Sequence, residues 1–190
     1  MNLLHRGFCA SGFWSRIVSD RIAPWVLEGM DIGRTVLEIG AGPGAATAYL
    51  RTRASRLTCI DVDEPSATRL RNRMARHHVT VLCEDATATS FAGESFDAAL
   101  CFSMLHHLPS VPLQDMMFAE VERVLRPGGT FAGFDICDTT MARLVHAFDT
   151  MTPVAPLALP ARLAAAGFAD IQVDVRTAGF RFRARRPRRG

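Results

Sequence analysis

The sequence of 190 residues contains no lysine, a single tyrosine and no long hydrophobic run. Without a run of about 18 apolar residues, we do not expect the chain to span a membrane. The lack of lysine excludes a P-loop, which needs that side chain to reach nucleotide phosphates. The five cysteines are scattered without Cys-x-x-Cys or Cys/His spacing, so no metal site is predicted. Unpaired cysteines and the absence of a recognisable signal peptide lead us to expect a cytoplasmic protein.

The positive charge is concentrated near the C-terminus. The formal net charge is +3, and all 22 basic residues are arginines. Six of these arginines lie in the last ten residues, and without them the chain has a net charge of −3. A slightly acidic body argues against a broad nucleic-acid-binding surface. The alternating segment from Arg181 to Arg189 is typical of a final strand with one buried face; the alternative is contact with RNA or an acidic substrate.

Short apolar segments alternate with helix-forming segments along most of the chain. Strands are expected at 36–39, 57–60, 79–82, 96–102 and 130–136. Helices are expected at 45–51, at 65–77 and after Pro112, the last with an apolar face of Met116, Met117, Val121, Val124 and Leu125. A short helix at 160–166 precedes a hairpin at 171–182. This order predicts an α/β fold with a mostly parallel sheet and one antiparallel strand.

A glycine-rich turn follows the first strand, and the other predictions depend on it. Gly40, Gly42 and Gly44 come directly after residues 36–39 and before a helix, as in nucleotide-binding βαβ units. The turn also matches a dinucleotide fingerprint, with Asp61 placed to bind a ribose. A short-chain dehydrogenase would need a Tyr/Lys pair, however, and this chain offers only Tyr49. A nicotinamide dehydrogenase is therefore the disfavoured alternative.

Several further motifs follow the turn in a characteristic order. The segment Glu38-x-Gly40-x-Gly42-x-Gly44 resembles motif I of class I S-adenosylmethionine-dependent methyltransferases. The resemblance extends over residues 33 to about 185 and continues with Cys59-Ile-Asp-Val-Asp63, Glu84-Asp-Ala86, Phe96-Asp97, Leu105-His-His-Leu108, Arg126-Pro-Gly-Gly129 and Ala165-Ala-Gly-Phe168. It implies a Rossmann-like three-layer sandwich whose seven-stranded sheet has the order 3-2-1-4-5-7-6, with strand 7 antiparallel.

The resemblance also implies roles for individual residues at the carboxyl ends of the strands. Gly40, Ala41, Gly42 and Gly44 would let the backbone approach the methionine and ribose parts of S-adenosylmethionine. Glu38 would orient the amino group of the ligand or the glycine turn; its alternative is a structural acid. Asp61 would bind the ribose hydroxyls, with helix capping as the alternative and Asp63 as another candidate cap. The remaining predicted cofactor contacts are Val62 and Ala86 with the adenine ring, Asp85 with its amino group, and Phe102 or Ser103 with the ligand ammonium.

Two histidines lie where the methyl acceptor should bind. His106 or His107 could remove a proton from the acceptor, although one of the pair is expected to be a packed structural residue. No metal is required, because methyl transfer from a sulfonium depends mainly on positioning the donor and acceptor.

The chain is expected to form one domain over residues 1–190. Residues 1–32 would form a helical segment, packed on the sheet or acting as a lid, with Pro24 breaking or kinking it. Residues 33–186 would form the core and residues 187–190 a basic tail. The N-terminal segment, or a second subunit in a possible homodimer, would complete the acceptor pocket. We expect methyl transfer to O, N or C of a small molecule, with S-adenosylhomocysteine as the product; the alternatives are an RNA or protein methyltransferase, or a cofactor-binding relative without methyl transfer.

Overall fold

The structure is a computed structural model that describes residue 7, residues 11–145 and residues 149–188. The beginning of the predicted lid, apart from Gly7, and the last two residues of the predicted tail therefore lie outside the described residues. Within the described ranges, every helix is too short or too polar to cross a membrane.

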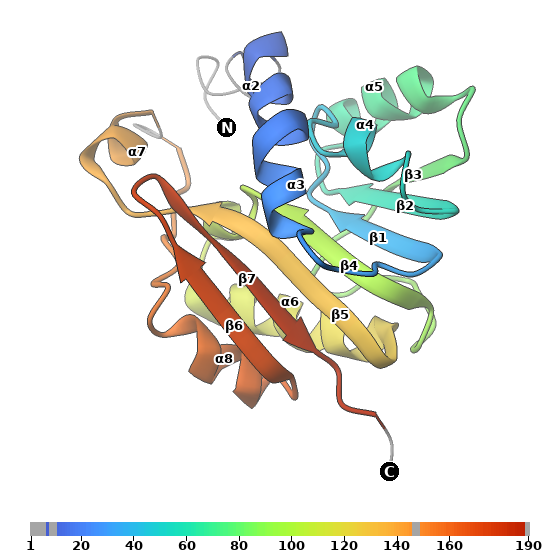
Figure 1. Ribbon diagram of the computed structural model, residues 1–190. Coiled ribbons are helices and arrows are strands. Elements are labelled where there is room, and N and C mark those ends of the chain that lie inside the picture. Colours follow the sequence, from blue (N-terminus) through green and yellow to red (C-terminus); the bar gives the residue numbers. More distant parts are fainter. Residues whose placement is uncertain (1–6, 8–10, 146–148, 189–190) are drawn as a thin grey trace.

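The seven strands form one sheet with the order β3-β2-β1-β4-β5-β7-β6 (Figure 1). The strands are β1 (Thr35–Ile39), β2 (Arg56–Asp61), β3 (Val79–Cys83), β4 (Phe96–Phe102), β5 (Leu125–Ile136), β6 (Ala169–Val175) and β7 (Gly179–Arg185). Strand β7 runs antiparallel to both of its neighbours, and the other pairs are parallel. The predicted strand order and the antiparallel seventh strand are confirmed.

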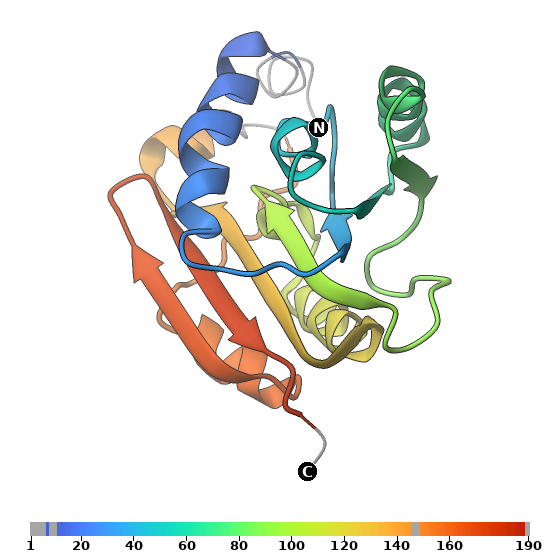
Figure 2. The ribbon, with the colours of Figure 1, turned by 45° about the vertical axis from the view of Figure 1, so that its right-hand side comes forward.

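Helices cover both faces of this sheet (Figures 1 and 2). One face carries α2 (Gly12–Ile17), the π-helical turn Val18–Ile22, α3 (Ala23–Val26), α4 (Thr47–Leu50) and α5 (Glu64–Met74). The other carries α6 (Val111–Val124) and α8 (Leu159–Ala165). A 3-10 turn (Leu105–His107) follows β4, and the short α7 (Thr140–Val145) follows β5.

Strands β1 to β5 contribute residues to two apolar cores, one on each face of the sheet, whereas β6 and β7 contribute to one of them. In β1, Leu37 and Ile39 pack with α6 and α8, whereas Val36 packs with the N-terminal helix and α5. Because both faces are covered, almost the whole of β1 is buried, which explains why Val36, Leu37 and Ile39 are apolar on both of its faces. The same arrangement places the carboxyl ends of the parallel strands along one edge of the sheet.

The N-terminal segment forms one continuous helix from Gly12 to Val26 rather than two. Pro24 does not break the segment into two helices, and a π-helical turn at Val18–Ile22 comes directly before α3, which carries the proline. The amide of Ala23 donates to the carbonyl of Val18, five residues back. A proline lacks an amide hydrogen and would clash with the carbonyl four residues before it, so the wider turn accommodates the ring.

Several details differ from the sequence prediction. The first helix after the glycines is only Thr47–Leu50, because tight turns occupy the residues before it. Helix α6 buries Met117, Val121 and Val124 as predicted, but Met116 is 52% exposed because it lies off their helical face. Leu125 starts β5, so the predicted fifth strand begins five residues earlier than expected.

The arginines near the C-terminus are used inside the fold. In β7, Phe180, Phe182 and Ala184 are buried, which confirms the predicted strand with one apolar face. On the other face, Arg181 forms ion pairs with Glu28 (3.1 Å) and Asp174 (2.9 Å) and donates to the carbonyl of Trp25. Arg183 donates to the carbonyl of Glu28 at 2.8 Å, and Arg186 pairs with Glu122 at 2.8 Å. Arg181 and Arg183 therefore fasten the N-terminal helix to the hairpin, and Arg186 links the residue after β7 to α6.

Candidate active site

A cavity of about 620 Å³ opens at the carboxyl ends of β1, β2 and β4. It gathers most of the residues predicted from the sequence, although they lie as many as 67 positions apart: Gly40, Ala41, Gly42, Asp61, Val62, Asp85, Ala86, Phe102, Ser103 and His107 all line it. Three predicted residues, Glu38, Gly44 and His106, are not part of the lining. The roles assigned to all of them remain predictions.

The glycine loop adopts a backbone that other residues would strain. Gly40, Gly42 and Gly44 have φ angles of 65°, 51° and 79°, in the left-handed region. A Cβ atom on Gly40 would overlap the side chain of Met104, which follows β4. The amides of Gly40 and Ala41 both donate to the carbonyl of Ile60 (2.9 and 3.1 Å), so the loop is held against the end of β2. Bare backbone therefore faces the cavity at Gly42.

Asp61 connects the glycine loop to the start of α5. Its Oδ2 accepts from the amide of Gly42 at 2.7 Å, and its Oδ1 accepts from the amide of Asp63 at 2.9 Å. Burial raises the pKa of this carboxyl above its usual value, although these two bonds oppose the rise. Asp63, not Asp61, caps the helix by accepting from the amide of Ser66 at 3.0 Å. Each Asp61 oxygen retains a further lone pair for a ligand hydroxyl.

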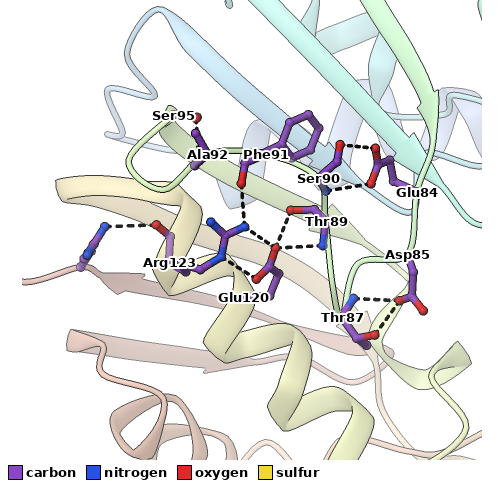
Figure 3. Close-up of polar contacts among 11 residues, drawn as sticks. Glu84, Asp85, Thr87, Thr89, Ser90, Phe91, Ala92, Ser95, Glu120 and Arg123 are labelled. Atoms are coloured by element: carbon purple, nitrogen blue, oxygen red, sulfur yellow. Dashed lines mark hydrogen bonds and ion pairs between the residues drawn. The ribbon is translucent and has the colours of Figure 1, made fainter.

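Asp85 and Ala86 lie on the loop that follows β3. Several hydrogen bonds within this loop and to α6 hold it in place (Figure 3). Asp85 Oδ1 accepts from the amide and hydroxyl of Thr87 at 2.8 and 2.7 Å, which forms a local turn. Further along, Thr89 donates its amide and hydroxyl to Glu120 of α6, at 2.9 and 2.5 Å. Glu120 in turn pairs with Arg123 at 2.7 Å. The loop that carries the predicted adenine contacts is thus anchored to α6.

Glu38 lies beneath the glycine loop and is only 2% exposed. Its Oε2 accepts from the hydroxyl of Thr47 at 2.7 Å and from the thiol of Cys59 at 3.2 Å. Burial raises the pKa of Glu38 to about 7, and these two donors partly oppose the rise. The side chain therefore bonds the strand before the loop to the helix after it. This geometry resembles the structural acid of the sequence prediction, but its partners are side chains rather than turn amides.

The end of β4 is strained at Ser103. This residue has a φ of 52°, and its amide donates to the carbonyl of Phe134 at 2.8 Å. The hydroxyl of Ser103 is buried and has no hydrogen-bond partner within the described structure. Strained backbone and an unsatisfied buried hydroxyl beside a cavity are features expected of a ligand site.

The two histidines after β4 have different environments. His106 is 2% exposed, and its Nδ1 lies 2.5 Å from Oδ1 of the fully buried Asp135 in β5. The amide of His106 also donates to Asp135, at 3.2 Å. His107, by contrast, lines the cavity. His106 is thus the buried member of the pair and His107 the one that lines the cavity, and the role of either as a base remains a prediction.

A mostly apolar wall completes the cavity beyond His107. It is formed by Trp14 from α2 together with Met104, Leu108, Pro109 and Leu113, and residues 149 and 150 lie beside it. The buried Gln114 donates to the carbonyls of Leu105 and Thr152 at 3.0 and 2.9 Å. The amide of Thr152 donates to the carbonyl of His106 at 2.8 Å. The segment that carries Asp149 and Thr150 is therefore bonded to the segment that carries His107.

Several residues that line the cavity were not predicted from the sequence. The position of Met104 and Leu108, directly after a strand, could have indicated them. Trp14 belonged to the predicted N-terminal helical segment but was not predicted to line the cavity. Asp149 belongs to none of the motifs found in the sequence. Across the described ranges, no group of three or more His, Cys, Asp or Glu residues is placed to hold a metal ion.

Residues 37–133 match the family model described as "Methyltransferase domain", and this match covers just over half of the chain. The chain belongs to this family. It has the Rossmann-like fold of class I S-adenosylmethionine-dependent methyltransferases.

Curated relatives match only part of the chain. A malonyl-[acyl-carrier protein] O-methyltransferase from Salmonella typhimurium is 34% identical over 117 residues, covering 62% of this chain and 45% of the relative. Ribosomal RNA small subunit methyltransferase A from Acidobacterium capsulatum is 42% identical over 71 residues, covering 36% and 25%. The methyltransferase chain thus spans less than half the length of these relatives.

Solved structures share the fold over most of their length. The PH0226 protein from Pyrococcus horikoshii has a TM-score of 0.79 at 16% identity, covering 94% of both chains. The N-methyltransferase NodS from Bradyrhizobium japonicum, in complex with S-adenosylhomocysteine, has a TM-score of 0.73 at 22% identity. That match covers 92% of this chain and 88% of NodS.

The residues present fit the cofactor that the family uses. The glycine loop exposes backbone to the cavity, and Asp61 lies on the adjacent strand with spare acceptor capacity. Val62 is 74% exposed at the rim, where an apolar side chain can cover a flat ring. The unpartnered Ser103 hydroxyl offers one more hydrogen-bonding group.

Proposed function

We propose that this methyltransferase transfers the methyl group of S-adenosylmethionine to O, N or C of a small-molecule acceptor. The observation that carries the proposal is the continuity of one cavity. At one side it meets the glycine loop, Asp61 and Asp85, and at the other it meets His107 and Trp14. A donor bound at the first side would direct its methyl group toward an acceptor at the second.

In this arrangement, S-adenosylmethionine supplies a methyl group on a sulfonium, and transfer breaks the carbon–sulfur bond as the acceptor's electron pair forms the new bond. Asp61 and Asp85 would hold the ribose and adenine, and the backbone at Phe102 or Ser103 would bind the ligand ammonium. His107 would accept a proton from the acceptor where the acceptor must lose one. The protein contributes mainly by positioning the two reactants.

Cofactor binding is tested first, by calorimetry with S-adenosylmethionine, S-adenosylhomocysteine and NAD. We expect the first two to bind and NAD not to bind. In Asp61→Asn, one carboxylate oxygen becomes an NH₂ group that cannot accept from a ribose hydroxyl, and the loss of one hydrogen bond to a charged group costs about 1.5–3 kcal/mol. We therefore expect at least about tenfold weaker cofactor binding. Asp170→Asn, an exposed change far along the sheet, is the control. Unchanged affinity in Asp61→Asn would contradict the proposed site.

The acceptor class is tested by incubating the protein with a metabolite extract and methyl-labelled cofactor. Transfer of label to a small molecule is the expected result. Label on RNA or protein would favour those acceptors instead. Cofactor binding without any transfer of label would favour a relative that binds the cofactor for another purpose.

A further inference from the structure

The glycine loop that faces the cavity is bonded to helix α5 as well as to the sheet. At the sheet, Gly42 donates its amide to Oδ2 of Asp61, at the end of β2, at 2.7 Å. At the helix, the guanidinium of Arg73 donates to the carbonyl of Pro43, the next residue of the loop. Pro43 lines the cavity, whereas Arg73, an exposed residue near the end of α5, does not. Two consecutive residues of the loop are therefore fixed by partners on different elements.

The loop also packs closely against α5 at Gly44. This residue has a φ of 79°, and a Cβ atom on it would overlap Nη2 of Arg73 and Cδ1 of Leu70. Leu70 is buried and lies three residues before Arg73 in the same helix. The amide of Gly44 donates to the carbonyl of Ala41 at 2.7 Å, which closes a tight turn with Pro43 inside it. A larger residue in place of Gly44 would displace either the loop or Arg73.

Hydrogen bonds between the loop and α5 form a closed ring. One oxygen of Asp61 accepts from the amide of Gly42, and the other accepts from the amide of Asp63 at 2.9 Å. Asp63 caps the start of α5. Arg73, in the last turn of the same helix, bonds to Pro43, which directly follows Gly42. The helix is thus connected to the loop at its start and again near its end, and Arg73 provides the second connection.

We propose that Arg73 is a positioning residue for the cofactor, because its bond to the carbonyl of Pro43 holds the glycine loop in the shape that receives S-adenosylmethionine. The inference rests on the proposed function, in which the backbone at Gly42 faces the methionine and ribose parts of the ligand. A loop that is already fixed loses little conformational freedom when the ligand binds, so more of the interaction free energy appears as affinity. Arg73 acts through the loop and does not itself touch the ligand.

The test measures the dissociation constant of S-adenosylhomocysteine by calorimetry for the wild type and three variants. Arg73→Met removes the hydrogen-bond donor, and Arg73→Lys keeps a donor and the charge. Arg69→Met makes the same change of charge at an exposed position four residues earlier in α5. We expect Arg73→Met to bind at least about threefold more weakly than the wild type, because a hydrogen bond that fixes the loop is lost. Arg73→Lys and Arg69→Met should stay within about twofold of the wild type.

Amide hydrogen exchange of the ligand-free protein adds a measurement that a general loss of stability would not reproduce. In Arg73→Met, the amides of Gly42 and Gly44 should exchange at least about threefold faster than in Arg69→Met, whereas amides within α5 should exchange equally in both.

Equal affinity in Arg73→Met and Arg69→Met would overturn the proposal. A loss of affinity that Arg73→Lys shares, or one without faster exchange at the two glycines, would also overturn it. Failure of the wild type to bind S-adenosylhomocysteine would instead refute the proposed function, so the two failures are distinguishable.

Discussion

The buried carboxyl of Glu38 should make the stability of this protein depend on pH in a specific way. Its folded-state pKa of about 7 lies well above the ordinary value of 4.5, because burial disfavours the charged form. The folded state therefore holds this proton more tightly than the unfolded state. Between pH 4.5 and pH 7 the unfolded chain releases the proton while the folded chain keeps it. The contribution to stability is thus complete below pH 4.5 and is lost as the pH rises through 7.

The size of the effect follows from the two pKa values. A rise from 4.5 to about 7 corresponds to about 3 kcal/mol, at about 1.4 kcal/mol per pKa unit. Glu38→Gln removes the titration but keeps a carbonyl oxygen that can accept from the Thr47 hydroxyl. Relative to the wild type, the variant should therefore gain about 3 kcal/mol in the free energy of unfolding between pH 4 and pH 8.

Urea unfolding followed by tryptophan fluorescence at several pH values measures this difference. Subtracting the wild-type curve from the variant curve cancels other carboxyls, such as Asp97 and Glu120, whose pKa values are lowered by hydrogen bonds and ion pairs. Asp170→Asn, at an exposed position, should give a difference that is flat with pH. A flat difference for Glu38→Gln as well would refute the assignment of a buried, high-pKa carboxyl beneath the glycine loop.

Two further substitutions test how the loop and the N-terminal helix are held. Gly40→Ala should destabilise the protein by about 1–2 kcal/mol more than Gly29→Ala, in thermal or urea unfolding. Both glycines have a φ of 65°, but only a Cβ at Gly40 would meet Met104, so equal losses would contradict the close approach. Arg181→Met should cost about 1–3 kcal/mol, because its partly buried guanidinium bonds Glu28, Asp174 and the carbonyl of Trp25. Arg143→Met, which breaks the exposed pair with Asp138, should lower the stability much less, and a similar loss in both variants would argue against fastening by Arg181.

Local patterns were sufficient to predict a mostly parallel sheet. Apolar runs of strand length, each followed by a helix former or a turn, predict parallel strands, and the alternation of Phe180 and Phe182 with arginines marks the final hairpin. The order of the strands, by contrast, followed from the resemblance to class I methyltransferases. The backbone hydrogen bonding of the helix around Pro24 was harder to predict. Only the structure shows that a π-helical turn before Pro24 keeps the helix continuous.

The direction in which a side chain points was not predictable where both faces of a strand are buried. Glu38 shares its face of β1 with Val36, and the neighbouring Leu37 and Ile39 are equally buried on the other face. Burial alone therefore does not distinguish a ligand-facing acid from a structural one. The partners of Glu38 decide the matter, and Thr47 and Cys59 lie nine and 21 positions away in the sequence.

Arginines in and beside the final hairpin are linked to the apolar wall of the cavity through the N-terminal helix. The guanidinium of Arg176 stacks on the Trp25 ring at 3.9 Å from its centroid, and Arg181 bonds the carbonyl of the same residue. These contacts hold one end of the continuous N-terminal helix, whereas Trp14 near the other end lines the cavity. Because the helix is continuous, Arg176 and Arg181 at one end help to position Trp14, which lines the cavity near the other end.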